Sequence, residues 1–413
     1  MKGFDLKRRW KGFLLFMAVA GPGIITSNVD NDAGGIATYS MAGSHFGYSL
    51  LWSLIPIMVA LVIIQEMSAR MGVVTGKGLS DLIRERFGVK VTVYVLVGVV
   101  LTNFGNVIAE FAGIASSLEI FHLSKYVSVP VGAVLVWLLV VKGTYRSVEK
   151  IFLYACLFYV TYIVSGFLSR PDWGEIGKSL VRPEFDFSSG RLGMIIGLVG
   201  TTIAPWMQFY LQASIVEKNV MTKDYKRSRL DVIFGSIVVT VVAGFIVLTC
   251  AATLFKAGIR VETAADAALA LKPLAGKYCS ALFAFGLLNA SLFAASILPL
   301  STAFLVCEGM GWENGVNKKF SEAPQFYGLY SLLIFLGAGI ILLPNIPLFS
   351  VMYISQIING IVLPAILIFM LLLINNKKLM GEYTNKRTYN TISWATVAIL
   401  CALTVAYIVT LIT

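Results

Sequence analysis

Eleven mostly apolar runs, separated by short polar segments, restrict the fold of this chain more than any other feature of its sequence. A membrane-spanning helix needs roughly 20 such residues. The runs cover about residues 13–44, 48–69, 92–118, 126–141, 148–168, 193–216, 231–255, 279–306, 326–344, 347–374 and 391–412. Only 13% of the 413 residues are charged and 57% are hydrophobic, whereas soluble domains carry about 25% and about 45–50%. The sequence therefore predicts an all-α polytopic membrane protein and excludes a soluble enzyme.

The basic residues give the chain an expected orientation. Cytoplasmic loops of membrane proteins collect Lys and Arg, and with the N-terminus inside, the inner segments hold 24 of the 33 basic residues. An odd number of spans then puts the C-terminus outside the cell. We expect a multi-pass plasma-membrane protein with a cytoplasmic N-terminus and an extracytoplasmic C-terminus. The net charge of +11 then reflects topology and contact with the lipid bilayer, so no nucleic-acid partner is expected.

The first and sixth runs carry helix breakers and polar residues near their middles. The first has two carboxylates and a Gly pair at bilayer depth, between Asp30 and Gly35. In the sixth run, Pro205 follows Gly200, Thr201 and Thr202 by about one helical turn. Unwound backbone is tolerated in a membrane only where it is buried in protein or lines a cavity. We therefore expect each run to split into two half-helices, with Asp30 to Gly35 in the first break.

The two broken runs begin equivalent groups of five spans. The first group covers about residues 13–168, the second about 193–374, and the span at about 391–412 is left over. Because five is odd, the second group enters the membrane from the opposite side, which makes an inverted repeat. Paired broken helices in such a repeat point to a transport site near the midplane of the bilayer. We expect residues 1–413 to form a single transmembrane transporter domain.

Several longer motifs lie along the chain. They are Gly21-Pro22-Gly23, the break from Asp32 to Thr38, Gln65-Glu66-Met67-Ser68-Ala69-Arg70-Met71-Gly72 followed by Thr75-Gly76-Lys77-Gly78-Leu79, the break at Pro205, Ser355-Gln356 and Leu363-Pro364. This pattern resembles the NRAMP family of divalent-metal transporters over nearly the whole chain. The resemblance implies a LeuT-type fold, with a 5+5 inverted repeat, an eleventh helix, and helices 1 and 6 broken at the midplane.

The chain departs from the family pattern at both breaks. Where the family reads Asp-Pro-Gly-Asn, this chain reads Asp32-Ala33-Gly34-Gly35. Where the family reads Met-Pro-His, it reads Ala204-Pro205-Trp206. The Asn and Met ligands that the resemblance implies are therefore Gly35 and Ala204 here, and the Asp ligand is kept as Asp32.

The resemblance implies a metal site where the two breaks meet, with Asp32 supplying the charge. By this analogy the backbone carbonyls of Val29 and Thr201 and the side chain of Gln356 face the ion. Asp30 either adds a second charge near the site or caps a helix end, and Thr hydroxyls contact bound water. The expected metal-site residues are Val29, Asp30, Asp32, Gly35, Thr201, Thr202, Ala204 and Gln356.

Loss of the Met and Asn side chains changes the expected substrate. A thioether favours softer transition metals, whereas carboxylate, carbonyl and water suit Mg2+, Ca2+ and Mn2+. The smaller side chains also enlarge the site, and Mg2+ dehydrates reluctantly and is held by one or two carboxylates plus water. The pattern resembles the branch called NRAMP-related magnesium transporters. We expect import of largely hydrated Mg2+ by alternating access, with Mn2+ also possible, and no cofactor or obligate protein partner.

The third run lacks the acids that the resemblance implies for proton coupling. In place of an Asp and a Glu three residues later, the chain has Asn103 and Asn106. The His of the sixth span is Trp206, and residues 326–343 of the ninth span contain no Arg. We therefore expect uptake driven by membrane potential without proton coupling. Glu110 has no family counterpart, and either pairs with a polar neighbour or restores coupling.

Other functions fit the sequence less well. A proton-coupled Mn2+ or Fe2+ importer of the ordinary family type is the main alternative, and Ala204, Asn103 and Asn106 argue against it. A sodium-coupled carrier of organic solutes is disfavoured because Asp32 would repel a substrate carboxylate at a half-helix N-terminus. No HExxH or GxSxG motif occurs, so an enzyme is not expected. Broken inverted repeats favour alternating access over a channel.

Overall fold

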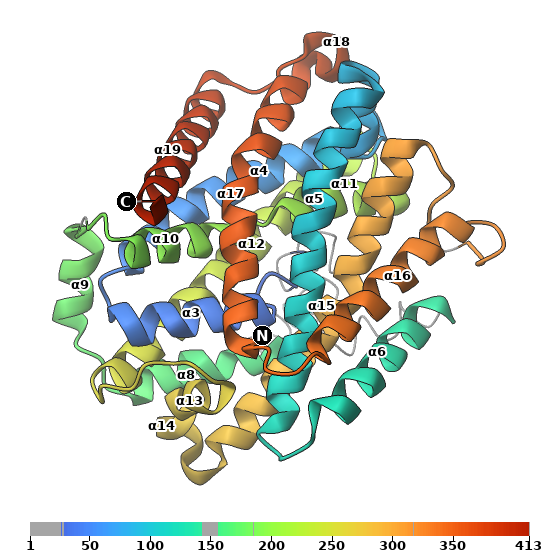
Figure 1. The fold of residues 1–413 in the computed structure, drawn as a ribbon. Helices are drawn as coiled ribbons and strands as arrows, with labels where there is room; N and C mark the ends of the chain where they lie inside the picture. Colours follow the sequence, from blue (N-terminus) through green and yellow to red (C-terminus); the bar gives the residue numbers. More distant parts are fainter. Residues whose placement is uncertain (1–25, 27–28, 143–155, 185, 317, 413) are drawn as a thin grey trace, which may run out of the picture.

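A computed structural model of the chain describes residues 26, 29–142, 156–184, 186–316 and 318–412, and no β-strand occurs among them (Figure 1). The long or central helices are α3 (Ala33–Phe46), α4 (Leu51–Thr75), α5 (Leu79–Glu119), α6 (Lys125–Val141), α8 (Val160–Leu168), α10 (Ser189–Thr202), α11 (Pro205–Glu217), α12 (Tyr225–Cys250), α15 (Cys279–Met310), α16 (Pro324–Ile341), α17 (Leu348–Ile374) and α19 (Arg387–Ile412). Short helices fill the connections: η1 (Cys156–Tyr159), α9 (Trp173–Val181), η2 (Thr222–Asp224), η3 (Ala251–Phe255), α13 (Ala264–Ala268), η4 (Leu269–Leu271), α14 (Lys272–Ala275), η5 (Gly276–Tyr278), α18 (Lys377–Met380) and η6 (Gly381–Tyr383).

The helices follow the predicted membrane spans in order. Within the described residues, 8 helical segments are long and apolar enough to cross a membrane, and α6 is a shorter apolar helix. With α3 and α8 they match the eleven apolar runs of the sequence. The Gly21-Pro22-Gly23 motif, most of the first half of the first span, and residues 148–155 of the fifth span lie outside the described part of the chain.

The helix α5 begins earlier than the third apolar run because it has two parts. Its backbone leaves the helical conformation at Gly88, where φ is +82°, a region in which Gly carries no steric penalty. Residues 79–87 therefore form a separate short helix, and the membrane-crossing part starts near the predicted residue 92. A turn at this point directs the longer part of α5 through the middle of the molecule (Figure 1).

The helix α3, which belongs to the first group of five spans, lies at the centre of the protein. It packs against α5, α10, α12, α15 and α17, and nearly all of its residues are buried. Small residues make this possible: a Cβ on Gly43 would lie 2.8 Å from the Cβ of Cys250. Helices in membranes approach closely where such residues face each other. Because α3 is enclosed on all sides, whatever its N-terminus binds is held inside the protein.

The helix α19 has the opposite character. It lies at the edge of the molecule (upper left in Figure 1), and only Ser393, Val397 and Leu400 of its side chains are buried. Its exposed apolar side chains suit contact with lipid, in which a Leu is as well solvated as between helices. This position agrees with the expectation that the eleventh span is additional to the two five-helix groups.

Candidate metal site

The break in the first span ends at Asp32, which is the N-cap of α3. The backbone of Asp32 is extended (φ −71°, ψ −171°), and its Oδ1 accepts a hydrogen bond of 2.7 Å from the N–H of Gly35. Asp is favoured here because its side chain satisfies an amide that has no partner inside the helix. The structure corrects the expected length of the break: Ala33, Gly34 and Gly35 already form the first turn of α3, because the Asp32 cap starts the helix before them.

The break in the sixth span consists of Ile203 and Ala204, between the end of α10 and the start of α11. Pro205 occupies the first position of α11, where its fixed φ is suitable and its missing N–H is not needed. In a continuous helix, the residue at this position would donate to the carbonyl of Thr201, and Pro cannot. A carbonyl oxygen is therefore left without a helical donor at the C-terminal end of α10, where the helix dipole favours a cation.

Glycines in α3 allow both breaks and α17 to meet. A Cβ on Gly34 would overlap the side-chain amide of Gln356. A Cβ on Gly35 would lie 2.7 Å from the carbonyl oxygen of Asp30 and 3.2 Å from Oγ1 of Thr201. The side chains of Asp32, Thr201 and Gln356, which are all buried, thus come together from three helices around the N-terminus of α3.

The two Thr residues of α10 differ in what their hydroxyls contact. Thr202 Oγ1 donates to the carbonyl of Leu198 at 2.8 Å and accepts from the hydroxyl of Tyr39 at 2.8 Å. The hydroxyl of Thr201 has no hydrogen-bond partner within the described residues, although it is buried. Of the two predicted site residues, Thr201 is therefore the one whose hydroxyl is free for an ion or a bound water.

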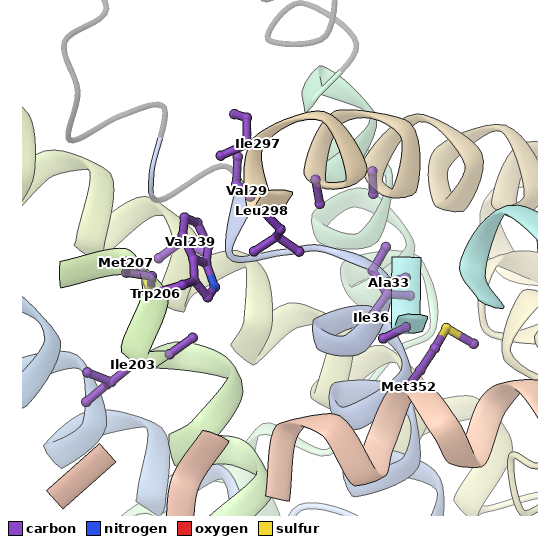
Figure 2. Close-up of a cluster of buried hydrophobic side chains, with 14 of the residues drawn as sticks. Val29, Ala33, Ile36, Ile203, Trp206, Met207, Val239, Ile297, Leu298 and Met352 are labelled. Atoms are coloured by element: carbon purple, nitrogen blue, oxygen red, sulfur yellow. The ribbon is translucent and has the colours of Figure 1, made fainter. Parts of the chain in front are cut away.

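The side chains of Val29 and Ala204 are apolar and offer no ligand atom to a metal ion. The side chain of Val29 belongs to the apolar core with Leu298 and Trp206, and Figure 2 shows the chain running from Val29 past Leu298 to Ala33. The carbonyl of Ala204 accepts from Met207 N–H at 3.1 Å and from Gln208 Nε2 at 3.2 Å. Ala204 therefore presents a methyl group where the family pattern has a thioether, and its carbonyl oxygen is already bonded within α11.

Asp30 is buried beside the site without any hydrogen-bond partner for its carboxylate within the described residues (1% exposed). It does not cap α3, because Asp32 does. Asp30 takes part in none of the ion pairs found among the described residues. A buried charge without a counter-charge is costly, so a cation bound at the site would stabilise the charged form of Asp30.

Glu110 lies beside the candidate metal site, although the sequence analysis did not place it among the expected metal-site residues. Its Oε2 accepts from the N–H of Ala33 at 3.3 Å, and its carboxyl group interacts directly with that of Asp32. A signal was present in the sequence, because Asn103, Asn106 and Glu110 are spaced to lie on one face of a helix. An acidic residue at bilayer depth on a polar helix face is a candidate functional residue.

Asn106 belongs to a buried network of side-chain amides. Asn359 Nδ2 donates to Oδ1 of Asn106 at 2.9 Å and to Oε1 of Gln356 at 2.9 Å, and Asn106 Nδ2 donates back to Asn359 Oδ1 at 3.2 Å. Gln356 Nε2 then donates to Ser355 Oγ at 3.1 Å. The network joins α5 to α17 and fixes the orientation of the Gln356 side chain.

We predict that Asn359→Leu raises the KM for metal uptake by about 10–100-fold, the usual effect of removing a residue that orients a metal ligand. Leu keeps the volume of the side chain but leaves Gln356 Oε1 without its donor. Uptake by reconstituted protein over a range of metal concentrations measures this. Asn103→Leu is the matched control, because Asn103 donates to Thr302 and not to Gln356. Equal KM values for Asn359→Leu and Asn103→Leu would show that the orientation of Gln356 is not the cause of the higher KM.

The fold resembles solved transporter structures. The manganese transporter of Eremococcus coleocola, solved with an aromatic bis-isothiourea substituted compound, superposes with a TM-score of 0.73 at 20% identity, covering 96% of this chain and 87% of that one. Mhp1, a nucleobase-cation-symport-1 family transporter with a LeuT-type fold, gives a TM-score of 0.56 at 14% identity, covering 94% and 90%. These likenesses confirm the predicted LeuT-type fold.

The sequence matches named relatives along almost its full length. The divalent metal cation transporter MntH of Ralstonia nicotianae is 31% identical over 415 residues, which cover 95% of this chain and 90% of that protein. MntH of Deinococcus radiodurans is 28% identical over 406 residues, with 95% and 90% covered. Residues 23–410 match the family described as "Natural resistance-associated macrophage protein-like". The chain therefore belongs to the Nramp family.

Proposed function

We propose that the chain is a divalent metal cation transporter of the plasma membrane that imports Mg2+, with Mn2+ also accepted. The observation that carries this proposal is the buried carboxylate of Asp32, held as the N-cap of α3 beside oxygen ligands from two other helices. The relatives named above are divalent metal cation transporters, which supports the transport of divalent cations and agrees with the absence of enzyme motifs.

The ligand set that we propose contains oxygen and no sulfur. Asp32, the carbonyl and hydroxyl of Thr201, and the side chain of Gln356 are its members, and Gly35 and Ala204 add no side-chain ligand. Oxygen ligands suit Mg2+ and Mn2+, whereas a thioether would favour softer ions. Because this set offers few direct ligands, we propose that the ion keeps several waters, as Mg2+ does when one or two carboxylates hold it.

Transport without proton coupling is the second part of the proposal. The amides of Asn103 and Asn106 are hydrogen-bonded to Thr302 and Asn359, and a side-chain amide does not ionise near neutral pH. The membrane potential alone provides about 4.6 kcal/mol per 100 mV for a divalent ion, from about 2.3 per charge. We further propose a cytoplasmic N-terminus and an extracytoplasmic C-terminus, supported by the 24 of 33 basic residues on the inner side.

A proton-coupled importer of Mn2+ or Fe2+ is the second candidate. The observation that favours it is Glu110, a buried carboxyl group in contact with Asp32, because such a group is a candidate proton carrier in a membrane protein. The structural relative from Eremococcus coleocola is also a manganese transporter. The two candidates differ in their proton flux and in their response to soft metal ions.

Proteoliposomes that report internal Mg2+ and internal pH distinguish these candidates. We expect Mg2+ uptake that rises with an inside-negative potential and brings no metal-dependent acidification. We also expect Cd2+ to compete weakly, because no thioether ligand is present. Empty liposomes under the same potential are the control. Acidification that appears only when Mg2+ or Mn2+ is added would support the proton-coupled importer instead, and strong Cd2+ competition would contradict the all-oxygen site.

A further inference from the structure

We propose that Glu110 is a second carboxylate ligand of the transported ion, so that Asp32 on α3 and Glu110 on α5 hold a divalent cation between them. This inference rests on the proposed function and extends its ligand set. The chemical class that it selects is a small divalent cation with hard-ligand preference, because two carboxylates neutralise two positive charges. With Asp30 also buried beside the site, a divalent cation offsets more of the buried negative charge than a monovalent cation does.

Close packing of two helices brings Glu110 to the site. One turn beyond it on α5, Gly113 faces the first turn of α3, and a Cβ there would lie 2.5 Å from the Cβ of Ala33 and overlap the hydroxyl of Ser291. Residues three apart lie on the same side of a helix. The missing side chain of Gly113 therefore lets α5 approach α3 closely enough for Glu110 to reach the helix N-terminus.

The backbone of Ala33 orients the carboxyl group. Its N–H donates to Glu110 Oε2 at 3.3 Å, and it is one of the amides at a helix start that have no partner inside the helix. The family pattern has Pro at this position, and a Pro would offer no N–H to Glu110. The N–H of Ala33 therefore holds Glu110 Oε2 at the start of α3.

The other carboxyl oxygen is available for an ion. Glu110 Oε1 has no hydrogen-bond partner within the described residues, and the side chain is 0% exposed. None of the ion pairs among those residues involves Glu110. Because Glu110 Oε2 accepts from the N–H of Ala33, the residue after the N-cap Asp32, both carboxyl groups lie at the start of α3. One or two carboxylates commonly hold Mg2+ together with water.

The test is binding of Mg2+ and of Mn2+ to the full-length purified protein, by calorimetry and by metal-induced thermal stabilisation. Glu110→Gln keeps an acceptor oxygen for Ala33 and removes the charge, so we expect at least a tenfold loss of affinity for both ions, on the order of that caused by losing a metal-site partner. Glu308→Gln is the matched control. It changes another buried Glu, which lies beside Gly78 at the start of α5, and we expect parent-like affinity.

Two further variants separate this inference from the proposed function. If Asp32→Asn loses metal binding while Glu110→Gln binds as the parent does, the role of Glu110 is overturned and the proposed function stands. If neither variant changes binding, the proposed metal site itself is wrong. Should the Gln variant not fold, Glu110→Asp keeps the charge on a shorter side chain. We expect reduced affinity in that variant, and an unchanged affinity would overturn the inference.

Discussion

Asp32→Asn and Asp32→Ala are both expected to reduce metal uptake at least about 100-fold, which exceeds the upper range for residues that only orient a ligand. The two variants differ in their effect on folding. Asn is as good an N-cap as Asp, whereas Ala costs about 0.5–2 kcal/mol of stability. If both variants lose uptake, the cause is the missing negative charge of Asp32 and not the loss of its N-cap hydrogen bond. Uptake of Mg2+ and Mn2+ into proteoliposomes, with the amount of reconstituted protein quantified, measures this.

A surface residue offers the matched control for Asp32. Asp172 is the N-cap of α9, and its Oδ1 accepts from the N–H groups of Gly174 and Glu175 at 2.9 and 3.0 Å. It has the same capping role at an exposed position far along the chain from the breaks. We expect Asp172→Asn and Asp172→Ala to transport as the parent does. Parent-like uptake in Asp32→Asn, with loss only in Asp32→Ala, would contradict the assignment of Asp32 as the residue that holds the cation.

The membrane spans and the two breaks could be predicted from the sequence because they depend on local chemistry. A carboxylate and a Gly pair at bilayer depth, as in Asp32 to Gly35, disfavour a continuous helix whatever surrounds them. Pro205 likewise interrupts the sixth span by its missing N–H. The limits of the first break depended on a finer effect, because the Asp32 side chain caps the helix and brings Gly35 into its first turn.

The partners of the site residues could not be predicted, because they depend on contacts between distant segments. Glu110 is 77 residues from Ala33 in sequence, and only the close packing of α5 on α3 joins them. The bonds of Asn106 to Asn359 similarly join residues 253 apart. Replacement of the expected acids by Asn suggested the loss of a proton path, but only the three-dimensional arrangement relates Asn106 to the orientation of Gln356. The spacing of Asn106 and Glu110 indicates that they share a helix face, but not which residues of α3 and α17 they contact.

The second large expected effect is a loss of stability when the close contact between α10 and α17 is disturbed. A Cβ on Gly200 would overlap the carbonyl oxygen of Gln356 and the amide of Gly360, and would lie 2.9 Å from Gly360 Cα. These are backbone atoms, which cannot move aside as a flexible side chain can. Overpacking costs about 1–3 kcal/mol and occasionally more, so we expect Gly200→Ala to destabilise the protein by about 3 kcal/mol or more.

Gly98→Ala provides a control with the opposite expected sign. No atom lies within 4 Å of a Cβ at Gly98, which is inside α5, and Ala is about 1 kcal/mol more favourable than Gly in a helix interior. We expect the thermal midpoint in detergent to fall for Gly200→Ala and to stay or rise for Gly98→Ala. Because Gly200 precedes Thr201 and contacts the backbone of Gln356, folded Gly200→Ala protein should also bind metal more weakly. Equal midpoints and affinities for the two variants would mean that α10 and α17 do not need this contact to form the site.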